Sequence, residues 1–264
     1  VDPVLLARNM ETAVAEKHLQ IYMREPTLAA LFTDLGWDGR LSPPSQDALM
    51  VVEMNVGFNK TNLLIERETM YSVDLRDADQ PTAVLTVAYT HTDDSSTAVC
   101  EQGEGIYEYH LKSYAAIADD CYFTYLRVYA PDGSDLTESS RHTVSGDVLI
   151  SEEEWSSQAT AFDEQTGFTT FSNFLVVERG GTAESRFEYA LPTAVVQNED
   201  GAQQYQLALY KQAGLRTESV HIELQLPAGA ELLQSSIVPS QQDGDRLQFD
   251  LLLDADIILT VTYQ

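Results

Sequence analysis

Basic residues are scarce in this chain of 264 residues, which has 15 Lys and Arg against 42 Asp and Glu. The formal net charge is therefore -27 at pH 7. A surface of this charge repels nucleic acid and anionic lipid headgroups, so the composition argues against both as partners. It suits a protein that stays soluble by self-repulsion, works in high salt or meets cations.

The sequence also lacks any run of about 18 apolar residues, so no segment is expected to span a bilayer. It begins with Val1, Asp2 and Pro3, which form neither an initiator Met nor a signal peptide. We therefore expect the chain to be part of a longer protein whose targeting segment lies upstream.

No catalytic signature is present. The five His fall in no HExxH spacing, and the chain contains no GxSxG elbow, GxGxxG run or phosphate-binding loop. Glycoside hydrolysis by a pair of carboxylates stays an open alternative, because among 42 acidic residues some lie within reach of each other. The sequence therefore favours a part of the protein without an activity of its own.

Only two cysteines occur, Cys100 and Cys121. In an exported protein they would form one disulfide, and closing a loop of this length stabilises a fold by roughly 3 kcal/mol. The alternative is a pair of free thiols with a redox or metal role, but the spacing is not CxxC. The sequence predicts the disulfide.

The first 45 residues differ from the rest because their apolar residues recur at helical spacing. We expect a helix over 3–17, a short strand over 19–23, and a helix from Pro26 that ends at Gly36. The two prolines in 41–45 indicate a linker.

From residue 47 the apolar period changes from about 3.6 to 2, which is typical of strands. The expected strands cover 48–53, 62–75, 82–92, 123–130, 147–151, 168–177, 185–191, 205–211, 219–226, 230–237, 247–253 and 257–263. Frequent turn residues between them favour antiparallel sandwiches. We therefore predict a mainly β fold: a helical N-terminal segment and linker over 1–45, and one or two immunoglobulin-like antiparallel β-sandwiches. The first would cover 46–192, and 193–264 would form the second or complete the first.

The stretch 122–129 is rich in aromatic residues, with Phe123, Tyr125 and Tyr129 on one face and Tyr122 on the other. Tyr125, Arg127 and Tyr129 alternate with Leu126 and Val128, so both faces are expected to be buried in a central strand.

Three stretches resemble a bacterial family known as domain of unknown function 4012. They are residues 17–22 continuing to 35–39, the Asn-rich run 55–62, and residues 121–129 together with the Lys-Gln-x-Gly turn at 210–214. The resemblance covers most of the chain and implies an envelope protein with an upstream membrane anchor and an upstream domain. The family brings no established activity with it.

The Asn-rich run is the most unusual local sequence, with Asn55, Asn59, Lys60 and Asn62 close together around Gly57. Asn amides offer donors and acceptors, and Lys60 supplies a positive charge in a negative field, so these four residues are candidate ligand-binding residues. The alternative is a turn in which the amides satisfy backbone groups. The sequence leaves both open and favours the turn.

Acidic residues cluster in several expected turns and could bind Ca²⁺ through their carboxylate oxygens. The candidates are Asp74, Asp77 and Asp79, with further pairs at Asp132 and Asp135 and at Asp243 and Asp245. None completes an EF-hand loop. A chain so rich in carboxylates also produces such turns by chance, so no cofactor is expected.

These observations predict a non-catalytic extracytoplasmic module of the cell envelope, which presents, spaces or binds, with an envelope protein or a glycan as partner. The alternative is an accessory domain that holds substrate for a wall-polymer enzyme whose catalytic part lies upstream. In either case the membrane is reached only through the upstream anchor.

Overall fold

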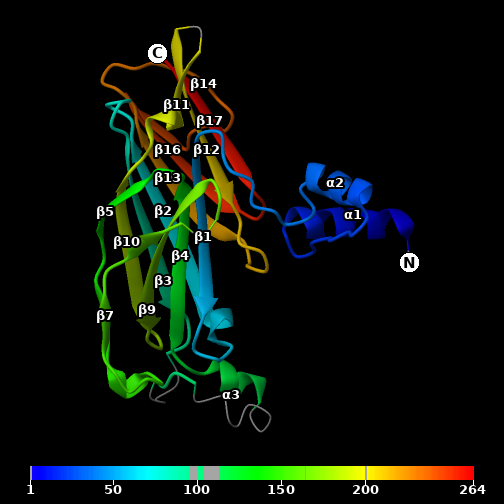
Figure 1. The fold of residues 1–264 in the computed structure, drawn as a ribbon, viewed down its shortest axis with the longest axis vertical. Helices are drawn as coiled ribbons and strands as arrows, with labels where there is room; N and C mark the ends of the chain where they lie inside the picture. The colour runs from blue at the N-terminus through cyan, green and yellow to red at the C-terminus, as the bar shows by residue number, and fades with distance from the viewer. Residues whose placement is uncertain (1, 95–99, 104–112, 164, 200) are drawn as a thin grey trace.

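The computed structural model describes residues 2–94, 100–103, 113–163, 165–199 and 201–264. Two large sheets form the body, and two helices stand beside it at the N-terminus (Figure 1). The expectation of a mainly β fold with a small helical N-terminal region is confirmed.

The N-terminal helices begin where the sequence places them. Helix α1 spans Pro3–Ala15 and helix α2 spans Pro26–Asp34, each with Pro in the first turn. The side chain of Glu25 accepts hydrogen bonds from the backbone N–H groups of Thr27 and Leu28 and so caps α2. Past the end of α2, Gly36 adopts a φ of 69°, a conformation that favours glycine.

The expected strand over 19–23 is wrong. These residues join α1 to α2 outside both sheets, where none of the described strands lies beside them to complete a ladder. The N–H of Ile21 instead donates to the carbonyl of Trp37, which ties the connection to the end of the helical segment. An alternating pattern forms a strand only where a neighbouring strand is available.

The first sheet has eight strands in the order β14-β17-β12-β1-β4-β9-β8, with β11 paired to β12. Its strands are β1 (Asp47–Asn55), β4 (Tyr122–Pro131), β8 (Thr160–Phe162), β9 (Phe168–Val177), β11 (Val196–Glu199), β12 (Ala202–Tyr210), β14 (Leu232–Ser235) and β17 (Ile257–Tyr263).

The second sheet has seven strands in the order β15-β16-β13-β2-β3-β10-β5. Its strands are β2 (Ile65–Asp74), β3 (Thr82–His91), β5 (Asp135–Ser139), β10 (Thr182–Ala190), β13 (Glu218–Gln225), β15 (Gln241–Asp243) and β16 (Arg246–Leu253). A small third sheet pairs β6 (His142–Val144) with β7 (Trp155–Ser157).

Both large sheets contain one parallel junction. Strand β1 pairs with β12 in parallel, and β2 pairs with β13 in parallel, while the other pairs are antiparallel. At each junction, strands from before residue 192 meet strands from after it. The expectation of purely antiparallel sheets is therefore wrong. Alternation within a strand indicates its buried face and not which distant strand lies beside it.

One apolar core lies between the two large sheets, with members from both sides of each parallel junction. Strand β4 runs between β1 and β9, and its two faces contact different clusters: Leu126 and Val128 lie in the main core, while Phe123 lies in a smaller one with Cys121 and Phe174. The expectation that β4 is a central strand covered on both faces is confirmed.

Two of the expected strands differ in detail. Residues 147–151 were expected as a strand, but Gly146–Val148 form a short 3₁₀ helix that the Ser145 side chain caps by accepting from the N–H of Asp147. The run 62–75 opens with another 3₁₀ helix, Thr61–Leu64, before β2 begins. Two further short helices were also not predicted from the sequence: α3 (Tyr114–Ala118) and η4 (Thr193–Val195).

A buried ionic cluster connects the sheets beside the second junction. Arg67 on β2 forms ion pairs with Glu218 on β13 and with Glu53 on β1, the latter at 3.4 Å between Nη1 and Oε2. All three side chains are at most 8% exposed. Thr69 also donates to Glu218. One cation thus neutralises part of the charge of two buried carboxylates.

A second buried polar group, Asp47, lies at the start of β1. Tyr71 of the facing sheet and Tyr205 of β12 donate to its Oδ2 at 2.9 and 2.5 Å, and the N–H of Ala48 donates to Oδ1 at 2.7 Å. Burial raises the pKa of Asp47 to about 7, although the hydrogen bonds from the two tyrosines act in the opposite direction. The fold therefore favours a neutral Asp47 more than water does.

Candidate functional site

The Asn-rich run forms a turn at one end of the sandwich, between β1 and β2. Asn55 donates from Nδ2 to Asn59 Oδ1 at 2.8 Å and accepts at Oδ1 from the N–H of Gly57 at 2.9 Å. A Cβ at Gly57 would lie 2.7 Å from Asn59 Nδ2 and 3.0 Å from Phe123, so only glycine fits this turn.

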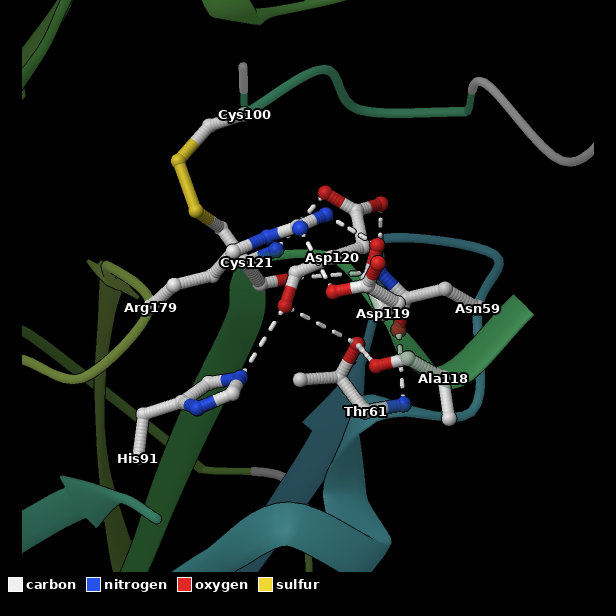
Figure 2. Close-up of a disulfide and its surroundings, with 9 residues drawn as sticks. All are labelled: Asn59, Thr61, His91, Cys100, Ala118, Asp119, Asp120, Cys121 and Arg179. Carbon is white, nitrogen blue, oxygen red and sulfur yellow. Dashed lines mark hydrogen bonds and ion pairs between the residues drawn. A yellow bond between two sulfur atoms is a disulfide. The ribbon is translucent and has the colours of Figure 1, made fainter. Parts of the chain in front are cut away.

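Asn59 and Thr61 hold the segment that leads into β4 (Figure 2). Asn59 Nδ2 donates to Asp120 Oδ2 at 2.9 Å and to the Cys121 carbonyl at 3.0 Å. Thr61 Oγ1 donates to the Ala118 carbonyl at 3.1 Å. Asn59, Thr61 and Asp120 are all buried, so these bonds are shielded from water.

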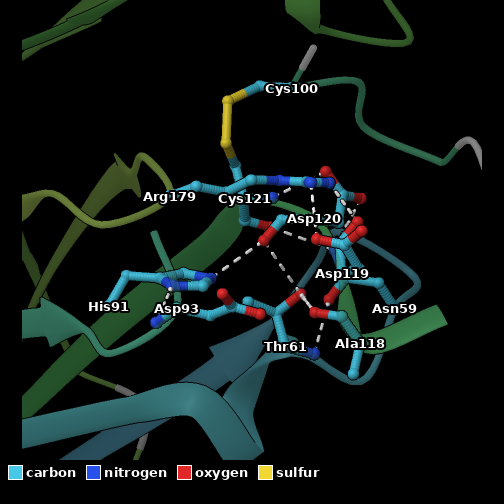
Figure 3. Close-up of polar contacts among 10 residues, drawn as sticks. All are labelled: Asn59, Thr61, His91, Asp93, Cys100, Ala118, Asp119, Asp120, Cys121 and Arg179. Carbon is cyan, nitrogen blue, oxygen red and sulfur yellow. Dashed lines mark hydrogen bonds and ion pairs between the residues drawn. A yellow bond between two sulfur atoms is a disulfide. The ribbon is translucent and has the colours of Figure 1, made fainter. Parts of the chain in front are cut away.

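His91 at the end of β3 contacts the same segment (Figure 3). Its Nε2 lies 3.1 Å from the Asp120 carbonyl, and its Nδ1 accepts from the N–H of Asp93 at 3.2 Å. A carbonyl can only accept, so the neutral ring with the proton on Nε2 satisfies both contacts. This His acts as a structural link between β3 and β4.

Arg179, in the turn between β9 and β10, completes the cluster in Figures 2 and 3. Its Nη1 donates to Asp119 Oδ1 at 2.6 Å, and its guanidinium also contacts the Asp119 carbonyl. The cluster thus joins the Asn-rich turn, β3, the β9–β10 turn and the approach to β4.

The predicted disulfide between Cys100 and Cys121 is confirmed, with 5.3 Å between the two Cα atoms. It fastens residue 100 to the buried start of β4, next to Asp120. A disulfide indicates an oxidising compartment, which agrees with the expected extracytoplasmic location.

Removing the disulfide tests how much the cluster depends on it. Replacing both cysteines by Ser should lower the free energy of unfolding by roughly 3 kcal/mol, because the unfolded chain regains the freedom of a loop of about 20 residues. Urea denaturation measures this loss. Reducing the wild-type protein should give a similar loss, and an unchanged denaturation midpoint after reduction would contradict the role.

The four candidate ligand-binding residues are brought together only in part. Asn59 is buried with its amide engaged by neighbouring groups, while Asn55 and Lys60 are half-buried and Asn62 is exposed. The Lys60 backbone N–H donates to the Ile117 carbonyl at 3.1 Å. Their role in ligand binding stays a prediction, and the contacts that the structure gives them are those of a turn network.

The acidic turn at 74–79 is engaged internally. Asp74 binds Arg76 through its side chain, and Asp77 accepts from the N–H of Asp79 at 3.0 Å. Within the residues that the structure describes, no three His, Cys, Asp or Glu side chains form a group that could hold a metal ion.

Two other stretches behind the family resemblance meet where the helical segment joins the sandwich. Buried Lys211 donates from Nζ to the carbonyls of Glu16 and Leu215 at 2.9 and 2.7 Å. Lys17 pairs with Asp256 at 2.7 Å. Gln212 exchanges two hydrogen bonds of 2.9 Å with the backbone of Glu53. Lys17 and Lys211 thus attach the N-terminal segment to the β body, while Gln212 joins two parts of the body itself.

A groove lies on the outer face of the seven-stranded sheet, across β16, β13, β2 and β3. Its volume is about 420 Å³. Polar and apolar side chains share its lining, which consists of Met70, Tyr71, Ser72, Val84, Thr86, His221, Ile222, Glu223, Gln248 and Asp250. Tyr71 and Ile222 are buried beneath it, so the surface of the groove is formed mainly by the outward residues of the four strands.

His221 lies between two carboxylates in this groove. Its Nδ1 is 2.5 Å from Asp250 Oδ1, and its Nε2 is 2.9 Å from Glu68 Oε1. Asp250 and Glu68 are 62% and 53% exposed, so both can contact a ligand. The hydrogen bond to Asp250 is the main cause that raises the pKa of His221. Glu223 adds a third carboxylate, paired with Arg246.

The sequence pattern alone does not reveal this groove. Outward polar residues at alternate positions in 219–223 and 248–250 mark exposed strand faces, but such faces are common in β proteins. These outward residues form one groove because β13 pairs with β2 in parallel, which places His221 beside Met70. That pairing joins segments about 150 residues apart and has no local signature.

Comparisons with known proteins give no family. No protein-family model matches the chain, and no curated protein matches it. Among solved structures, a candidate nutrient-binding protein of Legionella pneumophila is similar at 9% identity and a TM-score of 0.44, over 82% of this chain and 72% of that one.

Two further solved structures are also similar. An M1 zinc metallopeptidase of Deinococcus radiodurans has 12% identity and a TM-score of 0.34 over 75% of this chain, and yeast LTA4 hydrolase has 7% identity and a TM-score of 0.39 over 79%. The matched regions span 42% and 30% of those proteins. With these TM-scores below 0.5, the similarities support no conclusion about function.

The described helices include none that is both long enough and apolar enough to cross a membrane.

Proposed function

We propose that this chain is a non-catalytic extracytoplasmic module of the cell envelope that binds a basic peptide segment of another envelope protein in the groove on its seven-stranded sheet. The observation that carries the proposal is the arrangement of that groove, in which Glu223 and Asp250 lie around the exposed side chain of Met70, and Glu68 contacts the lining residue His221. The disulfide supports the extracytoplasmic setting.

The charges and the floor fit Lys and Arg side chains. Glu68, Glu223 and Asp250 carry three negative charges; Arg246 pairs with Glu223, and His221, when protonated, pairs with the other two. Met70 is 43% exposed in the floor, so the aliphatic stem of a basic residue can lie on it while the charged end reaches a carboxylate. The net charge of -27 would also steer a cationic partner toward the protein.

The lining favours a peptide over a glycan. Tyr71 is the one aromatic residue that lines the groove, and it is 1% exposed, so its ring offers no platform for a sugar to stack on. The second candidate function is the accessory domain that holds a wall polymer for an upstream enzyme. The acceptors of Ser72, Thr86 and Gln248 around the groove are the observation in its favour.

The wider setting belongs to the same proposal. The chain would be the extracytoplasmic part of a longer protein organised like the domain of unknown function 4012 family, held at the cell surface by an upstream anchor. Its body would then be an immunoglobulin-like module that presents the groove to the partner.

Binding of tetralysine, measured by calorimetry in buffer of low ionic strength, tests the groove. The double variant Glu223→Gln, Asp250→Asn should weaken binding about tenfold, because each exposed ion pair contributes up to about 1 kcal/mol. The control Asp77→Asn, Asp79→Asn removes the same charge from an exposed turn and should change binding less than twofold. Equal weakening in both variants would mean that tetralysine responds to total charge and not to the groove.

Soluble wall fragments provide the comparison between the two functions. The peptide-binding proposal predicts no measurable heat with them. Binding of wall fragments that the groove variant abolishes, without specific tetralysine binding, would contradict the proposal and support the accessory domain.

A further inference from the structure

The N-terminal arm, residues 2–45, presents an unusual amount of exposed apolar surface. Only Val14 of α1 is buried, and no residue of α2 is. Seven aliphatic side chains of the two helices and their ends are 44–61% exposed: Val4, Leu5, Leu6, Met10, Leu28, Leu31 and Leu35. Leu19 and Tyr22, at 38% and 82%, extend this surface through the connection between the helices.

The arm is fixed to the body at its base and stands away from it beyond that point (Figure 1). Lys17 binds Asp256 at 2.7 Å, and Lys211 binds the Glu16 carbonyl at 2.9 Å, both at the end of α1. In the linker, the Ser42 carbonyl accepts from Tyr210 at 2.9 Å. The exposed apolar side chains are therefore carried by a segment that is fixed to the body at its base.

The arm carries much less net charge than the rest of the chain. Residues 2–45 contain six acidic and four basic residues, a formal net charge of -2, while the whole chain carries -27. Two bodies of this charge repel each other, so close approach of two copies costs least at the nearly neutral arm.

The apolar area also matches what a dimer needs. Nine side chains about half exposed offer on the order of 400 Å² of apolar surface, at roughly 100 Å² for each side chain if fully exposed. A standard interface buries about 800 Å² on each partner, of which roughly 500 Å² is apolar. The largest apolar patch on a typical monomer is about this size and often serves as an interaction site.

We infer that the arm is a homodimerisation surface: α1 and α2 of one copy pack against α1 and α2 of a second copy across a two-fold axis. The same patch then serves both partners, as a closed dimer requires. This inference uses residues outside the groove and does not depend on the proposed function.

Sedimentation equilibrium of the whole chain between 1 and 200 µM tests the inference. The wild-type protein should be a reversible dimer in this range. The double variant Leu6→Glu, Leu31→Glu should weaken dimerisation at least tenfold, because it buries four carboxylates in the interface, two from each copy. The control Val238→Glu changes a side chain that is 86% exposed away from the arm and should leave the dimer intact.

Salt gives a second readout that separates apolar contact from charge pairing. Raising NaCl from 50 to 500 mM should tighten the dimer, since it screens repulsion between the two bodies. A monomer at every concentration, or a dimer that persists in the Leu6→Glu, Leu31→Glu variant, would overturn the inference. A monomer that binds neutral phosphatidylcholine vesicles through this surface would also overturn it and assign the arm to a membrane surface.

Discussion

Replacing Arg67 by Met should destabilise the protein by about 3–5 kcal/mol, because it leaves the buried carboxylates of Glu53 and Glu218 without their cation. The three residues lie on β1, β2 and β13, so the ion pairs connect the two sheets beside the parallel junction. The loss should appear as a lower midpoint of urea denaturation with an unchanged slope.

Two comparisons separate the buried charge from the volume of the side chain. The variant Arg67→Met, Glu53→Leu, Glu218→Leu removes all three charges and should recover most of the lost stability, because apolar replacement of a whole buried cluster is often nearly neutral. Arg76→Met removes an arginine that is 65% exposed in its pair with Asp74 and should cost less than about 1 kcal/mol. A triple variant no more stable than Arg67→Met would contradict this account.

Replacing Asp47 by Asn should change how stability depends on pH. The pKa of Asp47 is about 7 in the fold against an ordinary value of 3.8, so between these values the folded state holds a proton that the unfolded state has lost. The contribution of Asp47 to the free energy of unfolding is therefore fully present below about pH 4. It is lost as the pH rises to about 7. The loss is on the order of 4 kcal/mol for a shift of about three pKa units.

Urea denaturation at pH 5 and pH 8.5 measures this effect. Relative to the wild-type protein, Asp47→Asn should be more stable at pH 8.5 than at pH 5, because the neutral amide avoids the cost of a buried charge. At pH 5 it should cost about 1 kcal/mol, since it disturbs the hydrogen bonds from Tyr71 and Tyr205. The control Asp79→Asn, in an exposed turn, should follow the wild-type profile. A constant difference between Asp47→Asn and wild type at both pH values would contradict the buried titration.

The local elements of this fold could be predicted where a single segment carries the whole signal. Helix α2 has Pro26 at its start and Gly36 past its end, and β9 was predicted at its observed limits because aromatic and β-branched residues fill most of the segment. The short strands β5 to β8, β11 and β15 were missed because three to five residues contain too little alternation to recognise. The strand expected at 19–23 failed because no partner strand lies beside it.

The candidate site could be predicted from the local sequence even less than the strands could. The disulfide could be predicted because two cysteines allow one pairing, and the Asn-rich turn stood out because its composition is unusual. The groove could not be found, because His221, Glu68 and Asp250 meet only after β13 joins β2 in parallel and β16 joins β13. Neither strand pairing can be recognised from the local sequence.

The most direct test of the proposed function is to identify the carboxylates that a bound basic peptide contacts. Carbodiimide coupling joins a lysine amine to a carboxylate with which it is in contact, and mass spectrometry of the digested protein identifies the acidic residue. We predict that tetralysine couples mainly to Glu68, Glu223 and Asp250, and that an excess of uncoupled peptide competes at these positions. Coupling spread over the 42 acidic residues without preference for these three would contradict the proposal.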